Sequence, residues 1–454
     1  MQRVNNNFAK LNLGRAHYAK WTGLFYSKMH MLYSPPMNVL RSLKHRPFAL
    51  LWMGQTTSRL GDSLYRIALA WWVLEKTGSA VAMGTVLIFT QIPLLLFLLV
   101  GGVVVDRLPR IRVMFNSDIL CGLIITFVTV FSWLDLLQIW HIYISSLLFG
   151  LVEAFFFPAY QAVIPQITPP DMLTSANSLN GLSQRVTGIV GPALGAALVA
   201  TGGTSITFGL NALSFFISAL FVFPLLKLNI EKNRSDTNHA GVINKSRTWK
   251  DMVRQGIADL REGWNAIIHV PWIWITIVIF GFLNIMEAGP RAVAMPFFIK
   301  NDLGADVGLL GIFGSSFSIG YVLGMLWLGQ YKRLRWRGRV SYMSIAINGI
   351  MLLLFGLKFP VPILIGSMFG YGVCMSIFSL IWTNTLQEMV PHELLGRVYS
   401  IDALGSWVLL PVGFAIAGWA TDLVGAPIVF LVGGFGTMIL TLIGLSHPAI
   451  RNLD

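Results

Sequence analysis

Charged side chains stand inside long apolar stretches of this sequence, and five of them fall into two similarly spaced sets. Arg59, Asp62 and Arg66 are three and four residues apart, and Glu287 and Arg291 repeat the second interval. In an α-helix these intervals place side chains on one face. A charge at the centre of a bilayer costs about 2.5–3.5 kcal/mol on insertion scales, so such residues usually serve a function. We expect the two sets to shape one central cavity that binds protons and a solute.

Glu153 differs from these residues because its surroundings, SLLFGLVEAFFFPAY, contain no other charge. Loss of hydration favours the neutral form of an isolated carboxyl group, whereas a neighbouring arginine favours the ionised form. We therefore expect Glu153 to bind the coupling proton, unless another helix supplies it with a cation.

A structural interpretation stays open for the other charges. Asp62 and Arg66, like Glu287 and Arg291, would then be pairs within one helix that neutralise each other. Asp118 lies six residues after a basic helix end, and we interpret it as structural.

The elements that position these residues are predicted by hydropathy. Of the 454 residues, 55% are hydrophobic and 12% are charged, against about 25% charged residues in ordinary soluble proteins. Apolar runs of roughly 20 residues are long enough to cross a bilayer as helices. The pattern predicts an all-α integral membrane protein with twelve transmembrane helices near residues 48–74, 81–105, 113–134, 140–164, 178–201, 205–226, 271–295, 306–329, 340–358, 361–387, 398–420 and 427–446.

Basic residues indicate which side of the membrane each loop faces. Twenty-seven of the 33 Lys and Arg residues lie on the side of the two termini, and only Lys76, Lys300 and Lys358 lie on the other side. Cytoplasmic loops are enriched in Lys and Arg, so we expect both termini to be cytoplasmic in an inner or plasma membrane. The net charge of +13 reflects these loops and does not indicate a nucleic-acid partner.

The chain divides into two halves that resemble each other. At an offset of 222 residues, Gly102 matches Gly324 and Gly191 matches Gly413. An even number of spans separates the copies, so the halves run parallel, as in one class of transporters with a site between the halves. The expected organisation is a basic N-terminal segment (1–46), a first six-helix half (47–228), a linker with an amphipathic helix (229–268), a second six-helix half (269–446) and a tail (447–454).

Other kinds of site find little support in the sequence. Both cysteines lie inside apolar spans, and none of the eight histidines lies at the centre of a span. We therefore expect no disulfide and no metal site. The chain lacks the phosphate-binding pattern G-x-x-x-x-G-K-[ST], and we expect a monomer without a cofactor and without enzymatic activity.

The segment GVVVDRLPRIR follows the second span. It resembles G-x-x-x-D-R-x-G-R-[RK], the signature of the major facilitator superfamily between spans 2 and 3, although Pro109 replaces the usual glycine. The resemblance implies a cytoplasmic latch, in which the aspartate faces a helix N-terminus and the arginines form charge-assisted hydrogen bonds. The residues of this latch are Gly102, Asp106, Arg107, Arg110 and Arg112.

The fifth span reads RVTGIVGPALGAAL, which is similar to the glycine–proline motif of antiporters in that superfamily. Its glycines allow two helices to approach closely, and its proline bends the helix. The motif residues are Gly188, Gly191, Pro192 and Gly195, of which Gly188 stands one place nearer than the pattern asks.

Further segments resemble the twelve-span drug–proton antiporter branch, which includes macrolide efflux and siderophore exporters. They are TTSRLGDSLYRIALAWWVLEKTGSA, FFFPAYQAVIPQI, ANSL and VPHELLGRVYS. The resemblance covers about residues 40–445 and implies the major facilitator fold and proton-driven export of amphipathic small molecules or drugs by alternating access. A lysophospholipid or metabolite permease of the same fold stays open, as does a membrane receptor or an integral-membrane enzyme.

Overall fold

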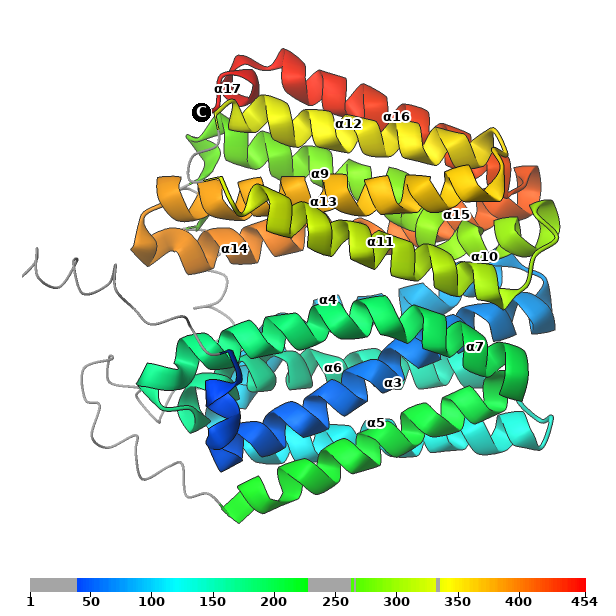
Figure 1. Ribbon diagram of the computed structural model, residues 1–454, viewed down its shortest axis with the longest axis vertical. Helices are drawn as coiled ribbons and strands as arrows, with labels where there is room; N and C mark the ends of the chain where they lie inside the picture. The colour runs from blue at the N-terminus through cyan, green and yellow to red at the C-terminus, as the bar shows by residue number, and fades with distance from the viewer. Residues whose placement is uncertain (1–38, 228–262, 265–266, 332–334) are drawn as a thin grey trace, which may run out of the picture.

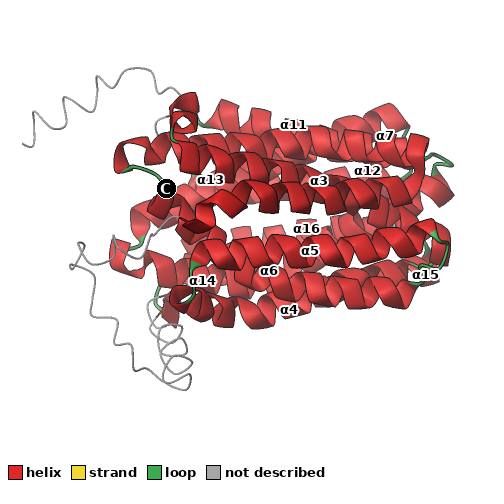
Figure 2. Cartoon of the chain, turned by 90° about the horizontal axis from the view of Figure 1, so that it is seen from below, coloured by secondary structure: helices red, strands yellow, loops and turns green. Residues whose placement is uncertain are grey.

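The computed structural model of the protein describes residues 39–227, 263–264, 267–331 and 335–454. These residues form helices joined by short loops, with no strand among them (Figure 2). Most of the expected linker helix lies outside the described residues. So do the side chains of residues 98–107, which include Gly102, Asp106 and Arg107 of the predicted latch.

Two helical bundles lie one above the other in Figure 1. The N-terminal half contains η1 (Val39–Lys44), α3 (Arg46–Thr77), α4 (Ala80–Arg107), α5 (Arg110–Trp133), α6 (Ile139–Ile167), α7 (Leu173–Val222) and η3 (Phe223–Lys227). The C-terminal half contains α9 (Pro271–Gly289), η5 (Pro290–Ala294), α10 (Met295–Phe297), η6 (Phe298–Asp302), α11 (Val307–Leu328), α12 (Arg337–Gly356), α13 (Val361–Met389), α14 (His392–Trp407), α15 (Leu410–Val424), α16 (Ala426–Ser446) and α17 (Pro448–Arg451).

Twelve spans are present among the described residues. Ten helical segments are long and apolar enough to cross a membrane. One of them contains α7, which holds two spans because Gly203 adopts a positive φ of 77° where the sequence predicts a turn. The twelfth span is α3, whose 32 residues carry the charges discussed above. Span 7 continues from α9 through the π-helical turns η5 and η6, and α14 with α15 forms span 11.

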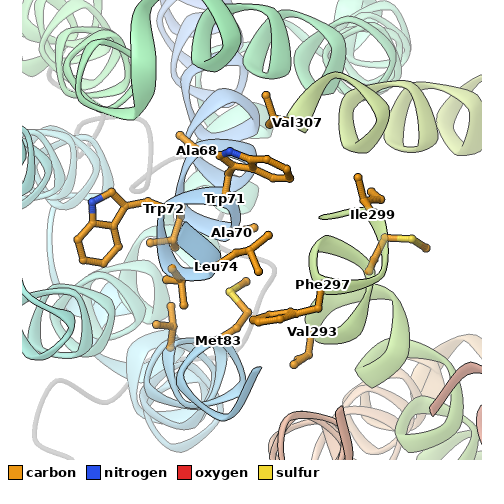
Figure 3. Close-up of a cluster of buried hydrophobic side chains, with 14 of the residues drawn as sticks. Ala68, Ala70, Trp71, Trp72, Leu74, Met83, Val293, Phe297, Ile299 and Val307 are labelled. Atoms are coloured by element: carbon orange, nitrogen blue, oxygen red, sulfur yellow. The ribbon is translucent and has the colours of Figure 1, made fainter. Parts of the chain in front are cut away.

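The apolar cores show how the halves meet. We call the end where α3 begins and α16 finishes the terminal end, and the opposite end the distal end. At the terminal end each half has its own core, around Phe48 and Ile164 in one and around Trp272 and Leu386 in the other. At the distal end one core crosses both halves. Figure 3 shows part of this shared core, which includes Trp71, Leu74, Met83, Val293, Phe297 and Ile299.

Glycines let the backbones of α4 and α15 touch at the distal end. A Cβ on Gly84 would lie 2.5 Å from the carbonyl oxygen of Phe414, and one on Gly418 would lie 2.8 Å from that of Ala80. Because the nearest atoms belong to the backbone, a larger residue would force the two halves apart.

The glycine–proline motif of α7 packs against both halves. A Cβ on Gly191 would overlap the Ser63 hydroxyl of α3, and one on Gly195 would lie 3.1 Å from the Leu64 Cα. These contacts hold α7 closely against α3.

On its other side, the same motif meets α11 of the C-terminal half. A Cβ on Gly311 would lie 2.7 Å from the carbonyl oxygen of Pro192. About one helical turn after Gly311, the Ser315 hydroxyl donates a 2.6 Å hydrogen bond to the Ile189 carbonyl. The motif therefore forms part of the contact between the halves.

Asp422 of α15 caps α4 across the boundary between the halves. Its carboxylate accepts hydrogen bonds from the backbone N–H groups of Ala80 (2.6 Å) and Val81 (3.0 Å) and from the Ser79 hydroxyl (2.6 Å). Negative charge is favourable at a helix N-terminus, where amides lack helical partners. This cap exists only while the distal end is closed.

Removing the cap is expected to favour opening of the distal end. Asp422→Ala should weaken the closed state by about 0.5–2 kcal/mol, the usual effect of losing an N-cap. A cysteine in place of buried Ala82, with Cys121 and Cys374 replaced, would report opening through its reaction with a hydrophilic thiol reagent. Asp306→Ala is the matched control, because Asp306 caps α11 within one half through the Gly308 N–H at 2.8 Å. Equal labelling rates in both variants would contradict the role of Asp422.

Orientation can be tested with single cysteines in the same background. Cysteines at the exposed positions Lys76 and Lys300 are expected to react with an impermeant reagent outside intact cells. A cysteine at exposed Arg335 should react only after lysis, because basic loops stay in the cytoplasm. Labelling at Arg335 from outside would reverse the predicted orientation.

Candidate functional site

A cavity of about 330 Å³ is lined by α3, α5, α6 and α7 of the N-terminal half. Four of the six residues that the sequence predicts for proton coupling and the cavity lie in its wall, and Asp118 joins them. Its charged lining residues are Arg59, Asp62, Arg66, Asp118 and Glu153. Gly188 of the glycine–proline motif also lines it, so this motif borders the cavity as well as the contact between the halves.

Aromatic rings form part of the remaining wall. Phe149, Phe156, Phe157, Tyr160 and Phe215 line the cavity. The rings of Phe156 and Tyr160 stack with their centroids 5.9 Å apart and an interplanar angle of 8°. Aromatic faces attract cations as well as apolar groups, so the wall suits molecules with both properties.

Arg59 is held by α6 and α7. Its guanidinium donates to Asn180 Oδ1 at 2.6 Å and lies 4.9 Å from the centroid of the Tyr160 ring. The Tyr160 hydroxyl donates to the same Asn180 oxygen at 2.6 Å. Asn180 could not be predicted from the sequence, since an uncharged residue on another helix carries no local signal of this contact.

Asp62 has no cation in direct contact. One of its oxygens, Oδ1, is buried without a hydrogen-bond partner, and no ion pair within 4 Å involves Asp62 in the described part of the chain. Asp62 and Arg66 therefore form no direct ion pair within α3. The Arg66 side chain is exposed, and its charge acts on Asp62 without a direct ion pair.

The sequence predicts Glu153 as the proton-binding residue unless another helix supplies it with a cation. Arg66 of α3 is such a cation. The charge of Arg66 on α3 acts on Glu153 of α6 as well as on Asp62, and the two carboxyl groups are electrostatic neighbours. The charge of Arg66 therefore acts on two carboxyl groups from separate helices, and the charge of Arg59 also acts on Asp62.

Asp118 belongs to a buried polar network. Its side chain is 2% exposed, and its Oδ2 accepts hydrogen bonds from Ser218 Oγ at 2.7 Å and from Gln55 Nε2 at 3.4 Å. Gln55 Nε2 also donates to Ser218 Oγ at 2.9 Å. The sequence predicts a structural role for Asp118. The structure shows in addition that Asp118 lines the cavity.

Glu287 and Arg291 do not line this cavity. The Tyr371 hydroxyl donates to Glu287 Oε2, and the Arg291 guanidinium lies 4.6 Å from the centroid of the Tyr371 ring. Glu287 is 6% exposed and makes no ion pair within 4 Å in the described residues. The expected single cavity is thus replaced by two separate groups, one in each half.

Of the predicted latch, two side chains can be placed. Arg110 donates to the Ala162 carbonyl of α6 at 3.4 Å, and Arg112 is exposed. Because the Asp106 side chain lies outside the described residues, the cytoplasmic latch stays a prediction. The latch motif implies a carboxylate at a helix N-terminus. A contact of this kind occurs at the distal end, where Asp422 caps α4.

Comparison with known proteins agrees with this architecture. The chain is 25% identical over 416 residues to macrolide efflux protein A of Streptococcus pyogenes, covering 90% of this chain and 97% of that protein. It is also 25% identical over 422 residues to the multidrug efflux pump Tap of Mycolicibacterium fortuitum, covering 91% and 99%. The resemblance to macrolide exporters that the sequence segments indicate is confirmed.

Solved structures share the fold at low sequence identity. The nucleoside transporter NupG superposes with a TM-score of 0.69 at 13% identity and covers 90% of this chain. A bacterial homologue of the iron transporter ferroportin in an inward-facing state gives a TM-score of 0.67 at 16% identity and covers 88% of this chain.

The family model described as transmembrane secretion effector matches residues 38–357, and the major facilitator superfamily model matches residues 282–451. The chain therefore belongs to the transmembrane secretion effector family of the major facilitator superfamily.

Proposed function

We propose that the protein exports amphipathic small molecules, including organic cations, in exchange for protons. The observation that carries this proposal is the cavity wall, in which three carboxyl groups stand beside five aromatic rings. A volume of about 330 Å³ is at the small end of the 300–1,000 Å³ typical of ligand pockets. The names of the relatives, which are macrolide and multidrug efflux pumps, support the same class of cargo.

Proton coupling would follow from competition for the charge of Arg66. If Glu153 binds a proton, Arg66 is left to balance Asp62, and the wall loses its attraction for a cation. If Glu153 releases the proton, two carboxylates share the charge of Arg66, and a cationic cargo gains a partner. The charge of Arg59 also acts on Asp62, but Asn180 and Tyr160 hold the Arg59 guanidinium in place, so its position would stay constant through the exchange.

Alternating access would operate between the terminal and distal ends. The shared apolar core and the Asp422 cap support a state that is closed at the distal end, while the separate cores at the terminal end support access from there. If the protein lies in an inner or plasma membrane with both termini in the cytoplasm, this state is inward-facing and receives cargo from the cell.

We propose that a monomer performs this cycle. Glu287 and Arg291 then stabilise the C-terminal half, and no catalytic chemistry is assigned.

Glu153→Gln is expected to abolish export driven by a pH gradient while cargo binding and exchange persist. Glutamine resembles the permanently protonated side chain, so the carrier cannot complete a proton cycle. Ethidium, a lipophilic cation, would be followed by fluorescence in proteoliposomes with and without an imposed gradient.

Glu388→Gln makes the same chemical change in an exposed carboxylate, which pairs with the half-buried Arg337 at 2.6 Å. Glu388 does not line the cavity, so this control should export at the parental rate. Full gradient-driven export by Glu153→Gln would exclude Glu153 from coupling.

Asp62→Asn is expected to weaken ethidium binding, because it removes from the cavity wall a carboxylate that would attract the cation. Losing a hydrogen bond or contact to a charged group costs about 1.5–3 kcal/mol, which corresponds to about a tenfold or larger rise in Kd. Binding would be titrated by fluorescence in detergent, with thermal unfolding as a check on integrity. An unchanged Kd in a folded variant would place cation recognition elsewhere.

A further inference from the structure

Asp118 lies between the terminal end and the other cavity carboxyl groups. It is eight residues into α5, which begins at Arg110, whereas Asp62 is sixteen residues into α3, which begins at Arg46. At a rise of 1.5 Å per residue, these positions are about 12 Å and about 24 Å from that end of the molecule. A proton that moves from Asp62 or Glu153 toward the terminal end would therefore pass Asp118.

Only neutral groups donate hydrogen bonds to this carboxyl group. In the described chain both bonds, from Ser218 Oγ and Gln55 Nε2, reach Oδ2. The donors are themselves buried, with Gln55 at 3% exposure and Ser218 at 0%. Oδ1 makes no hydrogen bond with a described residue, so it is the atom available to a proton.

The charged groups around Asp118 provide no close cation. Helix α3 contributes Asp62, Arg59 and Arg66, and α6 contributes Glu153; no ion pair within 4 Å joins any of them to Asp118. Arg185 of α7 lies over the Tyr321 ring of the other half at 4.3 Å, and Lys227 of η3 is exposed. The described part of α4 that precedes residue 98 carries no charge.

Asp118 is thus a deeply buried carboxyl group that needs a proton or a passing cation to balance its charge. Arg66 balances Asp62 and Glu153 in part, but Asp118 has no comparable partner. The reasoning that favours Glu153 in the sequence, an isolated carboxyl group in an apolar region, applies in the structure to Asp118.

We propose that Asp118 is a second proton-binding site, which receives the proton from Asp62 or Glu153 and releases it to water at the terminal end. This inference rests on the proposed function. The proton leaves a carboxylic acid deeper in the cavity, binds the Asp118 carboxylate, and departs into bulk water. Both carboxylates are then ionised again, and the cavity can accept the next cation.

Asp118→Asn separates this role from a structural one. Asparagine retains an oxygen that can accept the bonds from Ser218 and Gln55, so a purely structural Asp118 would tolerate it. As a proton carrier, the variant should lose gradient-driven ethidium export by about tenfold or more. Its ethidium exchange without a gradient should stay within about twofold of the parental rate.

Ser218→Ala is the matched control, because it removes a hydrogen bond to Asp118 but keeps the carboxyl group. It should retain gradient-driven export. A third readout is the release of protons when ethidium is added to purified protein, followed with a pH-indicator dye; it should decrease in Asp118→Asn and persist in Ser218→Ala.

The outcomes distinguish the two proposals. Gradient-driven export by Asp118→Asn at the parental rate would overturn the role of Asp118 and leave the proposed function intact. Loss of exchange together with export in Asp118→Asn would also overturn it, in favour of a structural role. Absence of any gradient effect in the parental protein would overturn both.

Discussion

Direct contact between backbones at the distal end is the constraint on which the rest of this structure depends. Gly84 and Gly418 bring α4 against α15, and Gly311 brings α11 against the Pro192 turn of α7. In a membrane, apolar side chains gain little by leaving lipid, so close packing through small residues must provide much of the attraction between helices. The parallel halves are thereby joined at one end, and their cores remain separate at the other.

The distal contact combines an apolar element with a polar one. The shared core excludes water around Trp71 and Phe297. The Asp422 cap adds hydrogen bonds that exist only when α15 meets the start of α4. A closed state built in this way is specific in its geometry, because the carboxylate must reach two backbone amides at once. The distal end can also open again, since the amides of α4 can form hydrogen bonds with water instead of with Asp422.

The two halves have diverged in their polar interiors. Asp62 and Glu287 each precede an arginine by four residues, yet Asp62 lines the cavity while Glu287 does not and accepts a hydrogen bond from Tyr371. The carboxyl groups that face the cavity all come from the N-terminal half. Under the proposed function, the first half would bind protons and cargo, and the second half would supply the surface against which the first half moves.

Much of this architecture could be predicted because it depends on local composition. Apolar runs of membrane length determine the spans, and the short polar break near Gly203 separates spans 5 and 6. The spacing of Arg59, Asp62 and Arg66 determines that they share a face of α3, and the motif around Gly191 and Pro192 indicates a close helix contact. Each of these features follows from neighbouring residues and the fixed period of a helix.

The grouping of the charges was decided only by tertiary structure. Helix periodicity states which residues share a face, but not which faces of different helices meet. Packing places Glu153 of α6 and Arg66 of α3 in the wall of one cavity, joins Arg59 to Asn180, and adds Asp118 to that cavity. It also separates Glu287 and Arg291 from that cavity. The sequence by itself therefore determined the spans, the repeat and the candidate residues, whereas the partners of each charge depend on distances between helices that no local pattern contains.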